Sequence, residues 1–508
     1  MVHPVVIALL LVIPFLIVYR RFARRAQHLP PGPPGLPLIG NVRDIPSPQE
    51  YPWLTYHRWS REYDTEILRL NALGMNIIVV DTMEAAKELL DRRSSIYSDR
   101  PRMIMLNELA GFGWNFGSMD YGEDWRMCRK MTHQEFHATS FKKYRPILAK
   151  EAYNLVRRLV NDRGSRVPVH LKHMVGANIM EVTYGIKVLP EHDPFIELAE
   201  AGQECVGQCA TAGVYLVELL PILKHLPTWL PGATFQRQAN AWHQKATRQL
   251  HVPYEDFVHR MKTGQVEDCM AKALLDTFGD DEESSRLAKM TTATMYMGGS
   301  ETIAASMHSF ILAMLLYPEV QERAHLEVEK VVGPNRLPTF DDFGSIPYID
   351  ALVKETLRWH PIVPLDLPHK LREDDVYAGY HLEKGSFVMV NHWSILHDEK
   401  HYPDPDLFNP DRFLTEDGTL NREVPDPEDA AFGFGRRVCP GQHMAYDTMW
   451  IAIACLVACL EIRKAKDEAG REIEVGEDFV SSFVSEPKPF PCEIRFRSEL
   501  YAAQLREL

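Results

Sequence analysis

The chain contains few cysteines, and none of them form a CxxC pair. Eight cysteines are spread over 508 residues, and no CxxC pair occurs. So few cysteines exclude a disulfide framework, and the missing CxxC pair excludes the usual zinc sites. We therefore expect the body of the chain to face the reducing cytosol.

Positive charge is also scarce. The sequence has 56 Lys and Arg residues against 70 Asp and Glu residues, which gives a formal net charge of -14 at pH 7. A basic stripe is missing outside the first residues, whereas nucleic-acid binding needs a basic surface that neutralises phosphates. This balance predicts that the protein has no nucleic-acid partner.

A dinucleotide-binding fingerprint, internal repeats and low-complexity tracts are all missing. The glycine-rich segment GFGWNFG, residues 111–117, has neither the GxGxxG spacing nor a strand-to-helix setting. With 45% hydrophobic and 25% charged residues, the composition is that of a large folded protein. We expect one domain over residues 42–508, because no further linker divides it.

The first residues predict a membrane anchor. An apolar run, residues 5–18, is followed by a tyrosine and four arginines within residues 19–25. A cleaved signal peptide has its positive charge before the apolar run. We expect residues 1–28 to form a single-pass anchor that leaves the body cytosolic. A buried core helix is the less favoured alternative, because nothing amphipathic accompanies the run. Residues 29–41, LPPGPPGLPLIGN, would be a stiff linker, since proline fixes φ.

Hydrophobic periodicity within the domain is mostly helical. Residues 67–82 alternate around a central glycine and predict a β-hairpin, and residues 83–94 predict a helix. Residues 290–317 carry Glu301 as their only charged residue. They predict a helix about 40 Å long, enough to cross a membrane. Its Thr, Ser, Gly and Glu content favours the core of the domain over a second span.

The segment MGGSET, residues 297–302, interrupts that helix with two glycines. Each glycine costs about 1 kcal/mol relative to alanine in a helix interior. The missing side chains of Gly298 and Gly299 would let a flat ligand or a small gas molecule approach a local break. Glu301 and Thr302 then form an acid-hydroxyl pair suited to relaying protons. The alternative is that small residues only allow close helix packing.

The segment FGFGRRVCPG, residues 432–441, surrounds one cysteine with glycines and arginines. A helix predicted over residues 444–460 follows Cys439, so its dipole and free N–H groups should lower the thiol pKa and prepare a metal ligand. Gly435 and Gly441 allow tight curvature beside a planar ligand, Phe432 could shield the sulfur, and Arg437 could pair with a carboxylate. An inert buried cysteine is the alternative.

Together these motifs resemble the cytochrome P-450 superfamily of haem-thiolate monooxygenases. The resemblance covers nearly the whole chain and implies a mainly α fold with small β-sheets, with one large haem domain after an N-terminal transmembrane helix. It implies haem b with Cys439 as the axial ligand, and catalytic roles for Glu301 and Thr302. The haem contacts that it implies are Trp125, Arg129, Gly298, Gly299, His369, Phe432, Gly435, Arg437, Cys439 and Gly441.

Two further motifs of the family are present, with one departure. Glu355 and Arg358 match its ExxR pair, and Arg412 lies in FNPDRF, the segment that completes a structural network with that pair. We expect these residues to be structural rather than catalytic. Ile303 stands where the family often has a second Thr or Ser, which weakens an accessory hydrogen bond and leaves the acid-hydroxyl pair intact.

The resemblance also implies partners and a location. Electrons would come from NADPH through a separate cytochrome P-450 reductase, with cytochrome b5 as an optional second donor; Arg126, Lys130 and Arg436 are candidate contacts, although each is more often a solvated charge. Similarity to membrane-bound fungal members implies the endoplasmic reticulum membrane and secondary metabolism. O2 would supply one oxygen atom to substrate and one to water. A haem-thiolate isomerase or dehydratase that does not use O2, and a haem sensor without activity, are the alternatives.

The segments that line the substrate pocket in the family are apolar in this chain. They correspond here to residues 103–116, Met297, residues 362–367, Phe483 and Val484. Such walls predict a hydrophobic substrate, for example a terpenoid, a polyketide or a fatty-acid-like compound. Methionines in these segments favour some promiscuity. Asp366 is the clearest charge, and we expect it to be structural more often than a cation-binding group.

Overall fold

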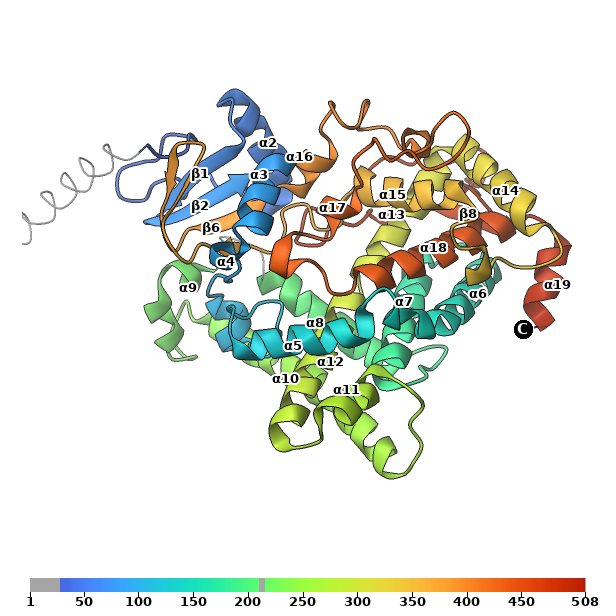
Figure 1. Ribbon diagram of the computed structural model, residues 1–508, viewed down its shortest axis with the longest axis horizontal. Coiled ribbons are helices and arrows are strands. Elements are labelled where there is room, and N and C mark those ends of the chain that lie inside the picture. The colour runs from blue at the N-terminus through green and yellow to red at the C-terminus, as the bar shows by residue number, and fades with distance from the viewer. Residues whose placement is uncertain (1–27, 210–214, 508) are drawn as a thin grey trace, which may run out of the picture.

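The computed structural model describes residues 28–209 and 215–507, so the predicted anchor, residues 1–28, lies outside the described part except for its last residue. Helices make up most of the protein, and the largest sheet lies at one end, beside α2 (Pro52–Glu62) and α16 (His392–Leu396) (Figure 1). The chain ends at the opposite end of the molecule, after α19 (Glu499–Glu507). The predicted mainly α fold with small sheets is confirmed.

The predicted hairpin forms the edge of the largest sheet. Strands β1 (Ile67–Ala72) and β2 (Met75–Val80) are antiparallel, and Leu73 and Gly74 between them both have positive φ, as a tight hairpin turn requires. The sheet continues through β6 (Phe387–Val390), parallel to β2, to β3 (His369–Lys370). Two smaller ladders pair β4 (Asp375–Tyr377) with β5 (Tyr380–Leu382) and β7 (Leu460–Lys464) with β8 (Cys492–Phe496).

The helices form the rest of the domain. The remaining helices are α3 (Met83–Ala86), α4 (Ser94–Tyr97), α5 (Glu123–Phe136), α6 (Arg145–Asn161), α7 (Val167–Tyr184), α8 (Pro194–Cys209), α9 (Leu216–Leu219), α10 (Thr234–Lys262), α11 (Met270–Phe278), α12 (Glu282–Gly299), α13 (Thr302–Leu316), α14 (Pro318–Val332), α15 (Pro347–Trp359), α17 (Glu428–Ala431) and α18 (Gln442–Cys459). The helix predicted after Cys439 is therefore present as α18.

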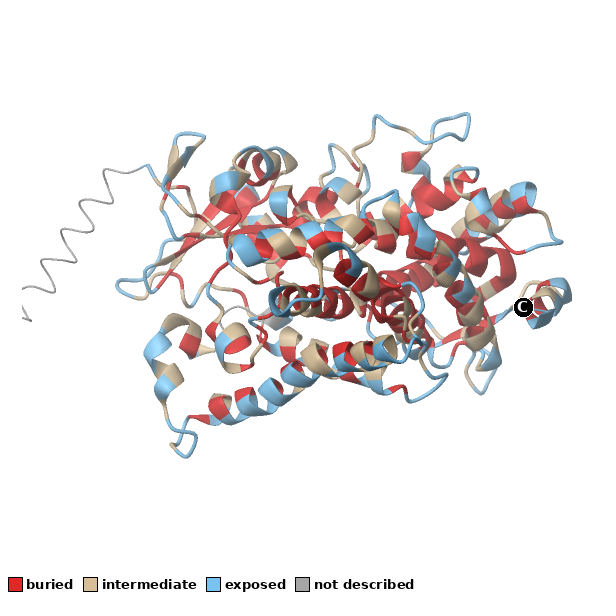
Figure 2. Cartoon of the chain, turned by 60° about the horizontal axis from the view of Figure 1, so that its bottom comes forward, coloured by how far each residue is buried: buried red, intermediate tan, exposed pale blue. Residues whose placement is uncertain are grey.

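The long apolar helix belongs to the core. Every residue from Ile303 to Leu315 in α13 is buried, and Figure 2 shows buried residues gathered in the middle of the helical part. Residues 282–316 are the one helical run in the described part that is long and apolar enough to cross a membrane, and 78% of its most apolar window is buried in the protein. The local break expected at the two glycines is present, because α12 ends at Gly299 and α13 begins at Thr302.

The helix predicted over residues 83–94 is also interrupted. It begins as α3, and residues 87–92 then wind as a π-helix. Its Leu90 carbonyl lies against Gly435, since a Cβ built on that glycine would be 2.0 Å from the carbonyl oxygen. Such wide turns are frequent near functional sites. Here the wide turn brings a backbone carbonyl against the segment that carries Cys439.

A buried ion network holds the end of α15 to the segments that follow it. Glu355 and Arg358 are fully buried and joined by two hydrogen bonds of 2.7 and 2.8 Å. Arg412 Nε approaches Glu355 Oε2 to 3.2 Å, and Arg358 also donates to the carbonyls of Leu396 and Leu407. One carboxylate thus faces two guanidinium groups, as the sequence predicts for a structural network.

We predict that Glu355→Gln strongly destabilises the protein. The change leaves two buried guanidinium groups without their counter-charge, which typically costs about 3–5 kcal/mol. Denaturant unfolding should show this loss. Glu62→Gln is the matched control, because Glu62 pairs with Arg58 on the surface, where both side chains are more than half exposed, and it should change the unfolding midpoint little. Equal midpoints for the two variants would contradict the structural role of Glu355.

Candidate active site

Residues 432–441, which we call the cysteine loop, connect α17 to α18. The Cys439 N–H donates to the Phe432 carbonyl at 2.7 Å and so ties the two ends of the loop together. Gly435 has a φ of +56° and lies against Leu90, so no other residue fits there without strain. A Cβ built on Gly441 would be 3.8 Å from Cys439 Sγ and 3.7 Å from Met295 Cε of α12. The loop therefore holds the sulfur close to the central helix.

Cys439 differs from the other cysteines of the chain. All eight cysteines lie in the described part, seven are buried, and Cys439 alone is half-buried. Burial raises the pKa of its thiol, although the N–H groups of Gly441 and Gln442 and the charge of Arg129 act in the opposite direction. The expectation of a lowered pKa is wrong for the protein without metal, because desolvation outweighs the helix terminus. A bound metal cation would supply the charge that deprotonates the thiol.

Three arginines gather beside Cys439. Burial lowers the pKa of Arg129, whose charge acts on the sulfur. Burial and the nearby charge of Arg100 lower the pKa of Arg437 to about 9, and burial lowers the pKa of Arg100 to about 10. Sequence reasoning predicted Arg129 and Arg437 and missed Arg100. The only available signal was an arginine three residues before the predicted pocket segment, in the sequence SDRP.

The carboxylates nearest these arginines have other partners. Asp99 forms an ion pair with Arg372 at 2.7 Å, and Asp120 forms one with Lys370 at 3.1 Å. Arg437 instead donates to the carbonyls of Ser98, Phe116 and Met119. The guanidinium groups of Arg100 and Arg437 are thus held in place by backbone carbonyls, and Asp366, whose charge acts on Arg100, accepts no hydrogen bond from it.

Two other predicted contacts lie in the same region. The Trp125 ring on α5 packs under the Arg437 guanidinium, whose carbon lies 4.4 Å from the ring centroid. His369 is buried on β3, and its Nδ1 donates to the Tyr97 carbonyl at 2.7 Å. Both predicted side chains therefore come close to the arginines, although they are more than 200 residues apart in the chain.

The break between α12 and α13 separates the roles of its two glycines. Gly298 is exposed although residues 291–297 before it are buried, and a Cβ built on it would meet no atom within 4 Å. A Cβ on Gly299 would be 3.1 Å from Ile179 Cδ1 of α7, which favours the packing interpretation there. Thr302 Oγ1 donates to the Gly298 carbonyl at 3.1 Å. Burial raises the pKa of Glu301, with Lys172 acting in the opposite direction.

These features fit a flat anionic cofactor with a metal centre. Gly298 borders open space, Cys439 keeps accessible surface, and the guanidinium groups of Arg100 and Arg437 donate to backbone carbonyls rather than to acids. Haem is flat, carries two carboxylates and takes a cysteine thiolate as an axial ligand. The residues present therefore fit haem better than they fit a small organic molecule or a bare metal ion.

The predicted substrate segments reach this region from two sides. The Phe116 N–H donates to Thr294 Oγ1 of α12 at 3.3 Å, and Asn115 Nδ2 lies 3.8 Å from Met297 Sδ. On the other side, residues 363–366 and Phe483 line one apolar pocket. The segments that the sequence places in the pocket wall are thus close to the central helix or to each other.

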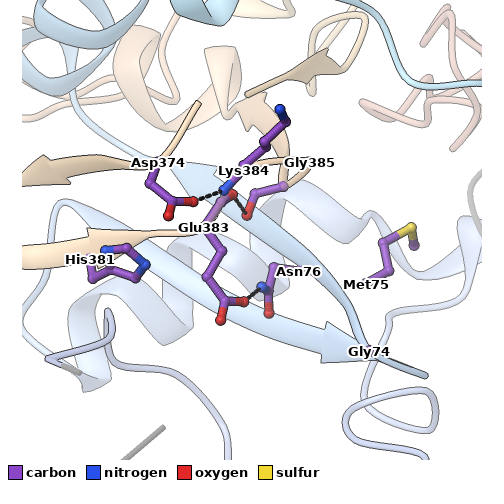
Figure 3. A pocket seen from close by; sticks show the side chains of 9 residues that line it. Gly74, Met75, Asn76, Asp374, His381, Glu383, Lys384 and Gly385 are labelled. Carbon is purple, nitrogen blue, oxygen red and sulfur yellow. Dashed lines mark hydrogen bonds between the residues drawn. The ribbon is translucent and has the colours of Figure 1, made fainter. Parts of the chain in front are cut away.

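A second, polar hollow lies away from these residues, at the edge of β2 and β5 (Figure 3). Asp374 Oδ1 accepts a hydrogen bond from the Lys384 N–H at 2.7 Å, and Asn76 donates to Glu383. Its main side chains therefore satisfy one another. Its polar lining includes neither Cys439 nor the central helix, and we do not assign it to the active site.

The chain is similar to a protein family and to characterised fungal proteins. The model of the family described as Cytochrome P450 matches residues 30–493. Tryptamine 4-monooxygenase of Psilocybe cyanescens is 39% identical, with 95% of this chain and 96% of that protein covered. Cytochrome P450 monooxygenase ple1 of Rhodocybe pseudopiperita is 38% identical, with 94% and 91% covered. Cytochrome P450 monooxygenase 98 of Postia placenta is 39% identical, with 97% and 95% covered.

We predict that Gly435→Ala disrupts the cysteine loop far more than a comparable change elsewhere. Gly470 is the matched control, since it also has positive φ, +78°, but a Cβ there meets nothing within 4 Å. Gly470→Ala should lower the free energy of unfolding only by the cost of placing alanine in the left-handed region, about 1–2 kcal/mol. Gly435→Ala adds a clash with the Leu90 carbonyl. Thermal unfolding followed by circular dichroism should show a clearly lower midpoint for Gly435→Ala, and equal midpoints would contradict the close contact.

Proposed function

The chain belongs to the cytochrome P450 family and is a monooxygenase of that family, and we propose that its reaction takes place at a haem b bound through Cys439. Haem iron with a thiolate ligand supplies reductive activation of O2. The balanced reaction converts substrate, O2, NADPH and a proton into hydroxylated substrate, water and NADP+. The observation that carries the proposal is the half-buried Cys439 beside Arg129, with Arg100 and Arg437 nearby, which donate to backbone carbonyls rather than to acids.

The arginines would hold the haem carboxylates. Arg129 and Arg437 come from α5 and from the cysteine loop, and Arg100 precedes both in the chain. A carboxylate that enters among them gains charge-assisted hydrogen bonds and removes the mutual repulsion of the guanidinium groups. Trp125 and His369 would contribute from the same side, as predicted. Phe432, Gly435 and Gly441 would shape the loop around the sulfur.

Glu301 and Thr302 would deliver the protons. A raised pKa lets the Glu301 carboxyl hold a proton nearer neutral pH, which a proton donor requires. Thr302 begins α13 with its hydroxyl on the Gly298 carbonyl, beside the open space next to that glycine. This arrangement favours a monooxygenase over an isomerase that does not use O2, because the latter needs no proton delivery to oxygen.

A separate flavoprotein would supply the electrons. Arg126 and Lys130 are exposed on α5, and Arg436 is exposed in the cysteine loop. The guanidinium groups of Arg126 and Arg436 both lie over the Tyr121 ring, at 5.8 and 5.1 Å. We propose that this face receives an acidic NADPH-cytochrome P-450 reductase, with cytochrome b5 as a second donor, because opposite charges steer association.

Residues 1–28 would anchor the protein in the endoplasmic reticulum membrane with the haem domain in the cytosol. A second apolar surface supports a membrane location, since Ile222 and Trp229 are 73% and 76% exposed. The curated relatives come from fungi, which supports a role in fungal secondary metabolism. The apolar pocket walls support a hydrophobic small-molecule substrate. One relative is named for tryptamine, so aromatic amines belong among the compounds to test.

We predict that Cys439→Ala abolishes the red-shifted Soret band of the reduced, carbon monoxide-bound protein. The band requires thiolate ligation, and the variant has no sulfur at this position. Cys269→Ala is the control, because Cys269 is buried elsewhere and should leave the band unchanged. A band that survives in Cys439→Ala would show that another residue binds the iron.

We predict that Thr302→Ala keeps the haem spectrum but diverts reducing equivalents to peroxide. The hydroxyl that positions a proton is lost, so oxygen should leave before it is cleaved. The measurement is hydrogen peroxide and product formed per NADPH, with reductase and an apolar compound that the wild type oxidises. Thr302→Ser keeps the hydroxyl and should restore coupling. Unchanged product per NADPH in Thr302→Ala would refute the proton-delivery role.

A further inference from the structure

One side chain of α8 reaches the break between α12 and α13. Gln203 Nε2 donates to the Met297 carbonyl, and it also donates to Ser300 Oγ at 3.3 Å. Ser300 Oγ in turn donates to the same Met297 carbonyl at 3.1 Å. These three groups therefore form a closed set of hydrogen bonds beside Glu301 and Thr302. The proposed proton delivery does not use Gln203.

This set of hydrogen bonds occupies the acceptor that a continuous helix needs. In an α-helix the Met297 carbonyl accepts from the N–H of Glu301, four residues later. A carbonyl oxygen has two lone pairs, and here Gln203 and Ser300 donate to both. Glu301 accordingly leaves the helical conformation, with a φ of -126° against about -63° in a regular helix. Gln203 thus competes with the helix for one carbonyl.

The two glycines permit the break but do not require it. Glycine weakens a helix without preventing one, and Gly298 and Gly299 both still belong to α12. Their missing side chains leave open space at Gly298 and let α7 approach at Gly299. The residue whose φ departs from the helix is Glu301. A competitor for the helical hydrogen bond explains why the departure occurs there.

Other contacts fix the position of α8. The Tyr296 hydroxyl of α12 donates to the Phe195 carbonyl near the start of α8. Next to Gln203, Gly202 lies so close to α10 that a Cβ built on it would clash with Gln249 Oε1. Because these contacts do not involve the break, α8 holds the amide of Gln203 at this level by itself.

The break also sets the position of the acid-hydroxyl pair. Thr302 begins α13 with its Oγ1 donating to the Gly298 carbonyl at 3.1 Å, beside the open space at that glycine. A helical φ at Glu301 would rotate the backbone there and carry both side chains around the helix axis. The position of the pair therefore depends on whether side chains keep the Met297 carbonyl occupied.

We propose that Gln203 is a positioning residue, which keeps the break open by holding the Met297 carbonyl and so keeps Glu301 and Thr302 beside the open space at Gly298. Without this donor, one lone pair of the carbonyl becomes free, and the Glu301 N–H completes the helix. The inference rests on the proposed function, because it concerns proton delivery at the same site.

Gln203→Met removes the donor and nearly keeps the shape of the side chain. Hydrogen exchange in the full-length protein, kept in detergent, measures the amide N–H groups of residues 301–303. Their exchange should slow about fivefold, the order expected for one backbone hydrogen bond gained. Faster exchange would show that Gln203 only stabilises the packing of α8, and unchanged exchange would show that the glycines alone set the break. Either result would overturn the proposal.

Two further variants separate the donor from other effects. Gln203→Glu keeps the shape but replaces the donor with an acceptor, so exchange of residues 301–303 should slow as in Gln203→Met. Slowing in Gln203→Met alone would be an effect of the apolar side chain and would contradict the role of the donor. Gln208→Met is the matched control, because Gln208 lies on the same helix, is exposed and donates to Glu204. It should exchange as the wild type does, and equal slowing in this control would refute the proposal.

The functional measurement is hydrogen peroxide formed per NADPH, under the conditions used for Thr302→Ala. Uncoupled turnover converts O2, NADPH and a proton into hydrogen peroxide and NADP+. Gln203→Met should form severalfold more peroxide per NADPH than the wild type while it keeps the carbon monoxide band, because a misplaced relay delivers protons less well. Gln208→Met should not.

The outcomes separate this inference from the proposed function. If Thr302→Ala loses coupling and Gln203→Met keeps it, the positioning role is wrong and the proposed function stands. If both variants keep coupling, the proton-delivery role is wrong as well. Absence of the carbon monoxide band in the wild type would contradict the proposed function, whereas hydrogen exchange would still decide whether Gln203 holds the break.

Discussion

Three guanidinium groups near Cys439, two of which donate to backbone carbonyls rather than to an acid, are the constraint around which this molecule is arranged. Burial lowers the pKa of Arg100 and Arg437; the charge of Arg100 lowers the pKa of Arg437 further, whereas the charge of Asp366 acts to raise the pKa of Arg100. The cost of burying such cations is offset only if their hydrogen bonds are satisfied. Segments far apart in the sequence supply those bonds through backbone carbonyls. A cofactor with two carboxylates would complete the charge balance that the chain leaves open.

In the Glu355 network, by contrast, the buried guanidinium charge is balanced within the protein. There two guanidinium groups surround one carboxylate, all of them are deeply buried, and the hydrogen bonds close within the protein. No unbalanced charge remains in this network for a ligand to bind, and the network is therefore structural. The comparison shows that buried charge alone does not identify a binding site. The distinguishing feature is whether the surrounding residues balance the charge.

The central helix combines tight packing and open space within two residues. Gly299 allows α7 to approach, while Gly298 faces a volume that no side chain fills. Beside the break that follows, the Met297 carbonyl accepts hydrogen bonds from the side chains of Gln203 and Ser300. Since Gln203 belongs to α8, the break is supported by a helix outside the motif. Sequence reasoning treated the two glycines as one feature and could not separate these roles.

Local sequence determined the hairpin, the helix after Cys439, the ExxR network and the motifs that identify the family, because each depends on spacing along the chain. It did not determine the π-helix at residues 87–92 or the raised pKa of Cys439. Those depend on which distant groups pack against the segment and how far they exclude water. The position of Arg100 beside Arg437 is of the same kind. Only tertiary structure brings such groups together, because burial and the pairing of charges are properties of neighbours in space.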